Sequence, residues 1–276
     1  MEDLTVAVVN FRSDFGQNTH NLQRMHKWTL RMADKGAEVV CFPEMSVCGY
    51  DHSWHISPFL ETIPGPATAR LQEIAAEAGV TLIAGMGEWV RGTERYISQV
   101  LVGPEGLLGV YRKTHLTLKE KHYFLPGSNL AVFEHPKARL GILVCHDLRY
   151  PETSTLLALQ GAEVIFACLA ASPRGGKGVA EKLHQLLPVR ALDNGVYLAA
   201  CNQTGFGRKG QTFDGAAVVV DPEGNILKQA SENHESALVC HLRAARLQRL
   251  HQPTGKNVFI GRRPELYAGL TRVRDD

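Results

Sequence analysis

Short apolar runs alternate with amphipathic segments along the whole chain. The runs are nearly continuous in apolar residues, as in TVAVV, EVVCF, GILVC and EVIFAC, and this pattern is typical of strands buried on both faces. Segments between them repeat apolar residues every three or four positions and predict helices. In the first half, these patterns predict strands over 4–10, 38–42 and 81–86 and helices over 19–33 and 67–78.

Two further strands close the first half, and the second half loosely repeats the same order. The strands over 96–102 and 107–111 flank the turn GPEG, in which Pro and Gly favour a hairpin. In the second half we expect strands over 140–144, 163–169, 196–200 and 236–242, helices over 152–159 and 178–192, and a hairpin around 221–224. Two similar halves of this kind predict two sheets.

The apolar strands also indicate how the layers stack. A strand that is apolar on both faces needs helices on one side and another layer on the other. A chain of 276 residues is long for one domain but lies within the range of layered α/β folds. We therefore expect residues 1–276 to form a single α/β domain, a sandwich with two similar halves.

Composition and charge argue against several classes of protein. Lysine and arginine number 30 against 28 acidic residues, and the two signs are intermixed, so no basic face suits a nucleic-acid backbone. No segment approaches the roughly 18 consecutive apolar residues of a membrane span. The start, MEDL, lacks the basic and apolar regions of a secretory signal, which favours the cytoplasm. We expect neither a nucleic-acid nor a membrane partner.

Ionisable side chains follow three of the predicted strands. Glu44 comes just after the strand over 38–42, Lys113 ends the strand of the first hairpin, and Cys145 ends the apolar run GILVC. Loops from several strands converge beyond the carboxyl ends of strands in α/β sheets, and ligands collect there. We therefore expect Glu44, Lys113 and Cys145 to meet in one pocket.

These residue types fit nucleophilic attack on a carbonyl or nitrile carbon. A thiol attacks as thiolate, so it needs a base or a cation beside it. Glu44 is the candidate base, and Lys113 is the candidate cation for the thiolate and for the oxyanion. The backbone N–H of His146 is a second candidate oxyanion donor, because the chain turns sharply after Cys145.

Each feature also has an ordinary interpretation. A cysteine that ends an apolar run is usually a core residue, as we expect for the cysteines at 41, 168, 201 and 240, and lone charged residues at strand ends are usually solvated. Pairing of Cys145 with His146 is disfavoured, because neighbours in an extended chain point to opposite sides, unless His115 or His122 approaches instead. The segment CGYDHSWH at 48–55 matches no zinc pattern, so we expect no metal.

Four motifs occur in order along the chain: FPEMSVCGY at 42–50, YRKTHL at 111–116, EKHYFLPG at 120–127 and VCHDLRYPE at 144–152. In order and spacing they resemble the signatures of the nitrilase superfamily of carbon-nitrogen hydrolases. The similarity continues through PVRALDNGVYLAACNQTG, FDGAAVVVDPEG and RRPELY, so it covers nearly the whole chain. This resemblance implies a four-layer αββα sandwich, which agrees with the two halves predicted from the apolar pattern.

The resemblance also implies roles for individual residues. The catalytic glutamate of the family falls on Glu44, its lysine on Lys113 and its nucleophile on Cys145, and a second glutamate matches Glu120 in the frame E-x-x-x-F-x-x-G. The implied reaction is hydrolysis of a small linear amide or N-carbamoyl compound through a thioester, without a cofactor. We also expect a homodimer or larger homo-oligomer, with residues 250–276 as a C-terminal arm.

Two alternatives to amide hydrolysis stay open. Relatives that hydrolyse nitriles typically carry Cys-Trp-Glu, whereas this chain has Cys145-His146-Asp147, as amidases and carbamoylases do. A catalytically inactive relative that serves as a scaffold would keep the fold without the chemistry, although the intact set of Glu44, Lys113 and Cys145 weighs against it.

Candidate substrate contacts lie in the loops. They are Tyr50, His146 and the loop over 170–178, which begins at Ala170 and includes Arg174 as a partner for a substrate carboxylate. An arginine between Pro and Gly-Gly is more often merely exposed. The substrate itself depends on loop geometry, which sequence patterns do not supply.

Overall fold

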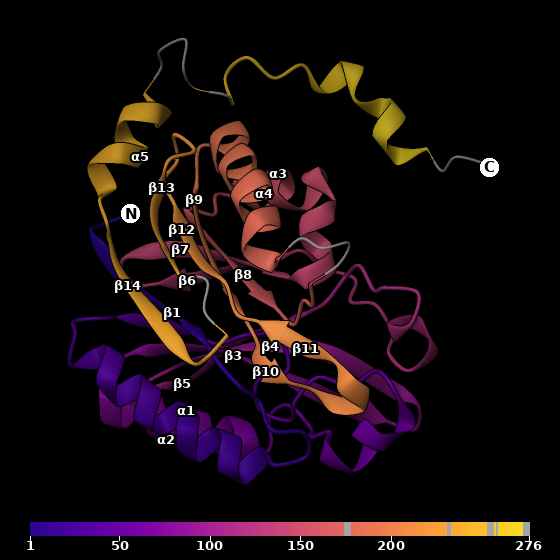
Figure 1. Cartoon of the computed structure of the whole chain (residues 1–276). Helices are drawn as coiled ribbons and strands as arrows, with labels where there is room; N and C mark the ends of the chain where they lie inside the picture. The colour runs from indigo at the N-terminus through magenta and orange to yellow at the C-terminus, as the bar shows by residue number, and fades with distance from the viewer. Residues whose placement is uncertain (174–177, 231–232, 253–256, 258, 273–276) are drawn as a thin grey trace.

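The computed structural model describes residues 1–173, 178–230, 233–252, 257 and 259–272. Within these residues the chain forms two six-stranded sheets, one two-stranded hairpin and five α-helices. The sheets pack face to face, and helices cover the outer face of each sheet (Figure 1). This order of layers confirms the predicted αββα sandwich.

The first sheet has three parallel strands at its centre. Its strands lie in the order β14 (Ser236–Leu242), β1 (Leu4–Asn10), β2 (Val39–Cys41), β3 (Thr81–Arg91), β4 (Glu94–Gly103) and β5 (Gly106–Arg112). β1, β2 and β3 are parallel, whereas β14, β4 and β5 are antiparallel to their neighbours. The connections between the parallel strands contain α1 (Asn18–Ala33) and α2 (Pro66–Ala78).

The second sheet repeats this arrangement. Its strands lie in the order β13 (Ile226–Ala230), β12 (Ala217–Val220), β9 (Tyr197–Asn202), β8 (Val164–Leu169), β7 (Ala138–Val144) and β6 (Val132–His135). β7, β8 and β9 are parallel, and α3 (Pro151–Leu159) and α4 (Val179–Asn194) connect them. Antiparallel strands flank the parallel ones in both sheets, so the two halves of the chain are alike, as predicted.

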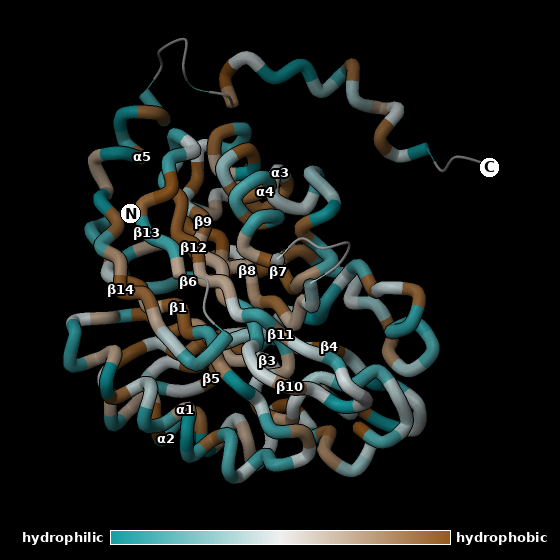
Figure 2. The backbone as a smooth tube through the Cα atoms, viewed as in Figure 1, coloured by the Kyte–Doolittle hydropathy of each residue, from teal (hydrophilic) through white to brown (hydrophobic). Residues whose placement is uncertain are grey.

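Three hydrophobic clusters hold the four layers together. Met25 of α1 and Leu71 of α2 pack on the first sheet, Leu187 of α4 packs on the second, and Val8 and Phe166 lie between the sheets. Burial of each side chain of this size contributes about 1.5–3 kcal/mol. Figure 2 shows hydrophobic residues gathered along the strands inside the stack, whereas hydrophilic and hydrophobic residues alternate along the outer helices.

Short or exposed elements were not predicted. They are β6, the hairpin of β10 (Thr204–Phe206) and β11 (Thr212–Asp214), α5 (Ala244–His251), and the 3-10 helices at Trp54–Phe59, Glu120–His122, Cys145–Arg149, Arg208–Gly210, Pro264–Leu266 and Ala268–Thr271. β3 also extends to Arg91, beyond the predicted end at residue 86. These elements bury few side chains: Phe133 is the buried residue of β6, and Leu247 is that of α5, so the apolar pattern is weak.

No helix in the described part of the chain combines the length and the apolar character that a membrane crossing requires.

Candidate active site

Glu44 lies at the end of the first sheet, three residues after β2, and its side chain is completely buried. One carboxylate oxygen, Oε2, accepts a hydrogen bond from the backbone N–H of Ala170 at 3.0 Å. Its backbone carbonyl accepts a hydrogen bond from Gln203 Nε2 at 2.8 Å. Residues that follow β8 and β9 of the second sheet therefore fix the position of Glu44.

Lys113 follows β5 directly, and its ammonium group lies between two buried carboxylates. Nζ donates to Glu44 Oε1 at 2.7 Å and to Glu120 Oε1 at 2.8 Å. Glu120 begins the 3-10 turn η2 (Glu120–His122), where its other oxygen accepts the Thr117 N–H at 2.7 Å. Since an ammonium has three donors, one N–H of Lys113 remains for a further acceptor.

The glycine of the E-x-x-x-F-x-x-G frame supports this lysine. Gly127 donates its N–H to the carbonyl of Lys113 at 2.8 Å. A Cβ atom at Gly127 would lie 2.2 Å from the carbonyl oxygen of Arg112, so no other residue fits without moving β5. Phe124 of the same frame is buried between the sheets.

Cys145 lies at the turn between β7 and α3. It begins the 3-10 helix η3 (Cys145–Arg149) and has φ 45, a left-handed conformation that costs a residue other than glycine about 1–3 kcal/mol. This turn moves the half-buried side chain out of the apolar strand, which explains why polar residues follow Val144 so abruptly. The backbone at Cys145 is not extended, contrary to the expectation on which a Cys145–His146 pair was disfavoured.

The charges of the buried groups act on one another. Burial raises the pKa of Glu44 to about 7, and the charge of Glu120 adds to this shift although Lys113 opposes it. Burial also raises the pKa of the Cys145 thiol, with a further increase from Glu44 and a decrease from Lys113. Burial alone would lower the pKa of Lys113. The negative charges of Glu44, the Cys145 thiolate and Glu120 outweigh this effect of burial, so the pKa of Lys113 is raised overall.

This arrangement suits a proton transfer that accompanies attack. At neutral pH the resting site holds a protonated thiol, because the pKa of Cys145 is raised, and a carboxyl at Glu44 whose pKa of about 7 lets it both accept and return a proton. Lys113 remains positively charged beside both groups and is available to a developing oxyanion. A half-buried thiol, a buried carboxyl group and a buried ammonium group are thus present together.

Three of the predicted substrate contacts, Tyr50, His146 and Ala170, lie next to residues of this group. Tyr50 donates its hydroxyl to Glu120 Oε1 at 2.7 Å, so it supports the second glutamate. The Ala170 N–H is already bonded to Glu44. The His146 ring lies 5.7 Å from the ring of Tyr150, and burial lowers its pKa. Arg174 lies outside the described residues.

Two buried polar residues next to the site were not predicted as functional. Gln203 anchors the backbone of Glu44, and Asp147 is wholly buried within the turn that begins at Cys145. Both are in stretches that carry the family resemblance, CNQTG and VCHDLRYPE, but a sequence pattern does not show that their side chains turn inward. His115 does approach this turn, as its Nδ1 lies 3.1 Å from Asp147 Oδ1.

Three cysteines that lie far apart in the sequence meet between the sheets. Cys41 Sγ lies 3.5 Å from Cys168 Sγ and 3.8 Å from Cys201 Sγ, and all three side chains are fully buried. These residues are core residues, as predicted, but no spacing indicated that their thiols form one cluster. Their sulfur atoms lie within 4.8 Å of one another, a spacing that would allow a metal ion.

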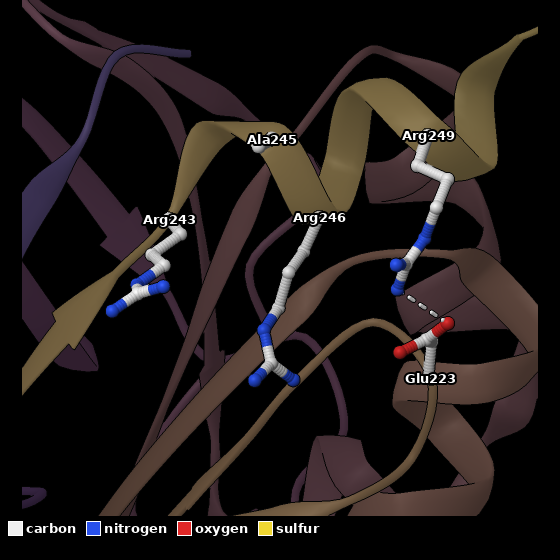
Figure 3. A pocket seen from close by; sticks show the side chains of 5 residues that line it. All are labelled: Glu223, Arg243, Ala245, Arg246 and Arg249. Carbon is white, nitrogen blue, oxygen red and sulfur yellow. Dashed lines mark hydrogen bonds and ion pairs between the residues drawn. The ribbon is translucent and has the colours of Figure 1, made fainter.

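A pocket in the described part of the chain has none of Glu44, Lys113, Glu120 and Cys145 in its lining. It is a pocket of about 310 Å³ beside α5, lined by Glu223, Arg243, Ala245, Arg246 and Arg249 (Figure 3). Arg249 Nη2 donates to Glu223 Oε1 at 2.8 Å, and Arg246 pairs with the buried Asp221. Since two of its arginines are paired with carboxylates and the pocket lining includes no thiol, it is not the candidate active site.

An αββα sandwich with a cysteine, a glutamate and a lysine at adjoining strand ends defines a class of enzyme, the hydrolases of non-peptide carbon-nitrogen bonds. Residues 5–252 match the family model described as carbon-nitrogen hydrolase. The chain therefore belongs to the carbon-nitrogen hydrolase family, which confirms the resemblance to the nitrilase superfamily.

Similar proteins include both nitrilases and amidases. The chain is 32% identical over 266 residues to a protein named nitrilase from Pyrococcus abyssi, covering 95% of this chain and 98% of the relative. It is 32% identical over 222 residues to an N-carbamoylputrescine amidase from Arabidopsis thaliana, covering 74% and 73%.

A solved structure shows how far the likeness extends in three dimensions. A double mutant of the amidase from Nesterenkonia sp. AN1, in complex with acrylamide, superposes with a TM-score of 0.84 at 26% identity and covers 97% of both chains. A single mutant of that amidase carries the acetamide moiety of fluoroacetamide added covalently at its active-site cysteine.

Proposed function

We propose that this protein hydrolyses a small linear amide or an N-carbamoyl compound through a thioester on Cys145. The observation that carries the proposal is the continuous contact from Glu120 through Lys113 to Glu44, all buried, next to a thiol held at a strand end. Covalent capture of an acetamide moiety by the active-site cysteine of the Nesterenkonia amidase supports the same role for Cys145.

The first half of the reaction forms the acyl-enzyme. Glu44 accepts the proton of the Cys145 thiol as the sulfur attacks the carbonyl carbon, and the resulting oxyanion is bound by the third N–H of Lys113 and by the backbone N–H of His146. The carbon–nitrogen bond then breaks, and Glu44 returns the proton to the leaving nitrogen. Ammonia or an amine departs and leaves a thioester.

The second half of the reaction hydrolyses the thioester. Glu44 accepts a proton from a water molecule that Glu120 helps to position, and the hydroxide attacks the acyl carbon. The carbon–sulfur bond breaks, the thiolate takes the proton back from Glu44, and the acid product leaves. These steps use side chains, the backbone N–H of His146 and water, so the proposal requires no cofactor.

Ammonia release tests this proposal directly. The purified protein is given aliphatic amides, ω-amides and N-carbamoyl compounds, and we expect turnover of at least one class. Cys145→Ala should lower kcat by about 10⁴-fold or more, as loss of a nucleophile does in other enzymes. Cys240→Ala, which removes a buried thiol remote from the catalytic group, should keep the activity. Full activity of Cys145→Ala would reject the mechanism.

Nitrile hydrolysis is a second candidate function. The Pyrococcus abyssi relative is named nitrilase, and its sequence covers nearly the whole of this chain. The same panel therefore includes aliphatic and aromatic nitriles. Ammonia release from nitriles but from none of the amides would replace the first proposal, and release from neither by a folded protein would favour the inactive scaffold.

Self-association and location belong to the same proposal. Leu156 and Leu159 on α3 and Leu192 on α4 are about half exposed, and their burial against a second copy would support a homodimer. The proposed C-terminal arm, 250–276, contains positions outside the described residues. Light scattering at several concentrations tests the homo-oligomer, and cell fractionation tests the cytoplasmic location.

A further inference from the structure

Asp147 is a completely buried carboxylate that accepts hydrogen bonds from two separate parts of the chain. Its Oδ2 atom accepts the Val144 N–H at 2.9 Å and the Tyr111 hydroxyl at 2.8 Å. Its Oδ1 atom accepts the His115 N–H at 2.8 Å and the Thr114 hydroxyl at 3.0 Å. Both oxygens therefore have full sets of partners.

These partners flank the two residues that the proposed reaction needs together. Val144 directly precedes Cys145, and Asp147 lies two residues after it, so the carboxylate closes the turn that holds the thiol. Tyr111, Thr114 and His115 lie on either side of Lys113. Asp147 thus connects the turn of the second sheet that carries Cys145 to the strand end of the first sheet that carries Lys113.

The backbone at Cys145 is strained, and the hydrogen bonds of Asp147 lie where they can stabilise it. The φ of 45 at Cys145 is unfavourable for a residue with a side chain, so the surrounding contacts must hold it there. The bond from the Val144 N–H to Asp147 Oδ2 spans this position, so it is one of the contacts able to hold it.

We propose that Asp147 is the positioning residue of this active site: it fixes the Cys145 thiol relative to the Lys113 ammonium. This inference rests on the proposed function and deepens it. Asp147 donates no proton and contacts no reacting atom in this assignment, because its oxygens are occupied by Val144, Tyr111, Thr114 and His115. Its effect on catalysis is entirely through the position of the nucleophile.

The hydrogen-bond pattern also explains why the residue must be a carboxylate. Each oxygen accepts one backbone N–H, that of Val144 on one side and that of His115 on the other. An asparagine in this place would direct its NH₂ group at one of these N–H donors, whichever way the amide is turned. Asp147→Asn therefore breaks the connection on one side while it keeps the shape of the side chain.

The test compares Asp147→Asn with a matched change elsewhere. Asp221 is as deeply buried as Asp147, and it also lies in a turn. Its side chain accepts hydrogen bonds from the backbone N–H groups of Glu223 and Asn225 at 3.0 and 2.9 Å. It is far from Cys145 in the sequence. Asp221→Asn should lower the thermal midpoint but leave kcat within about threefold. Asp147→Asn should lower kcat at least 100-fold and change KM by less than about threefold, at a temperature where circular dichroism shows both variants folded.

A measurement that needs no substrate separates this inference from the proposed function. The rate of Cys145 alkylation by iodoacetamide, followed from pH 6 to 10, reports how the thiol is placed beside Lys113 and Glu44. We expect Asp147→Asn to slow or shift this profile and Asp221→Asn to leave it unchanged. If the wild-type protein releases no ammonia but Asp147→Asn still changes the alkylation profile and Asp221→Asn does not, the proposed amide hydrolysis is rejected and the positioning role of Asp147 stands.

A pair of tyrosine variants covers the case in which Asp147→Asn fails to fold. Tyr111→Phe removes one hydroxyl that donates to Asp147, and Tyr197→Phe removes a buried hydroxyl that donates to the Arg243 carbonyl at 2.9 Å. Tyr111→Phe should lower kcat about fivefold or more and alter the alkylation profile, whereas Tyr197→Phe should do neither. Wild-type kcat and alkylation in Tyr111→Phe, or in a folded Asp147→Asn, would overturn the inference.

Discussion

The central feature at the scale of single residues is one buried cation between two buried carboxylates. Lys113 contacts Glu44 and Glu120, and none of the three side chains is exposed to solvent by more than 1%. Charges in such a place are tolerated only when each is paired, because taking them out of water costs several kcal/mol per ion. The same pairing raises the pKa of Lys113 and, against burial, lowers that of Glu120. Stability and chemistry therefore depend on the same contacts.

Replacement of Lys113 should show this dependence. Lys113→Met leaves two carboxylates buried without a cation, so we expect a loss of about 3–5 kcal/mol in the free energy of unfolding, measured in urea. The double variant Lys113→Met, Glu120→Gln removes one of the stranded charges and should recover part of the loss. Equal stability of the wild type and the single variant would contradict the burial of this group.

The raised pKa of Glu44 predicts an acid limb in the pH profile. Glu44 accepts a proton only when it is ionised. The value of kcat/KM should therefore increase as the pH is raised through about 7 and should be low at more acidic pH. Glu120→Gln removes a negative charge that raises this pKa, so the limb should move to lower pH. A limb that stays in place in Glu120→Gln would mean that another group titrates.

At the scale of elements, the site depends on strands that end close together. Glu44, Lys113 and Cys145 follow the ends of β2, β5 and β7, respectively. β3 lies against the segment that carries Glu44. The backbone N–H of Val47 donates to the carbonyl of Gly85 on β3 at 2.9 Å. A Cβ atom at Gly85 would lie 2.3 Å from the Met45 nitrogen and 2.4 Å from the Pro43 oxygen. Only a glycine lets the segment of Glu44 pack this closely.

A single methyl group at this strand should therefore move the base. We expect Gly85→Ala to reduce kcat about 10-fold or more, because the atoms in its way are backbone atoms on both sides of Glu44. Gly103→Ala on the neighbouring β4 provides the control, since the atom nearest to its added Cβ is the flexible end of Leu108 at 3.2 Å. If both variants keep wild-type kcat, the close approach has no role in catalysis.

At the scale of the whole molecule, the sandwich separates one cysteine from five others. Cys145 is half-buried at the strand end, whereas the remaining five are buried in the core. The cluster of Cys41, Cys168 and Cys201 forms only because strands of both sheets face each other there. One fold thus gives the six thiols very different access to solvent.

Mass spectrometry after alkylation should reveal this difference. The native protein treated with excess iodoacetamide should gain one label per chain, on Cys145, while the urea-unfolded protein gains six. Cys145→Ala should remain unlabelled in the native state. A label on any of the five buried cysteines under native conditions would show that the sandwich opens on the timescale of the reaction.

Much of the fold was predictable because its strands are apolar on both faces. β1 was predicted with the boundaries that the structure has, since burial on both sides leaves a nearly unbroken apolar run. The boundaries of β14 were also predicted, although most of this edge strand is only partly buried. β6 and the hairpin of β10 and β11 were missed, because few of their side chains are buried and their pattern is weak. The candidates Glu44, Lys113 and Cys145 were found because strand ends are where polar residues interrupt apolar runs.

The order of apolar runs and the residues that end them were decided by the sequence alone, because burial on both faces and the chemistry of a thiol are local properties. The contacts between distant segments were decided only by the tertiary structure. Lys113 meets Glu44 across 69 residues, and the two oxygens of Asp147 join Val144 to Tyr111 across the two sheets. Such contacts depend on how the layers stack, and a pattern along one strand carries no information about the strand that faces it.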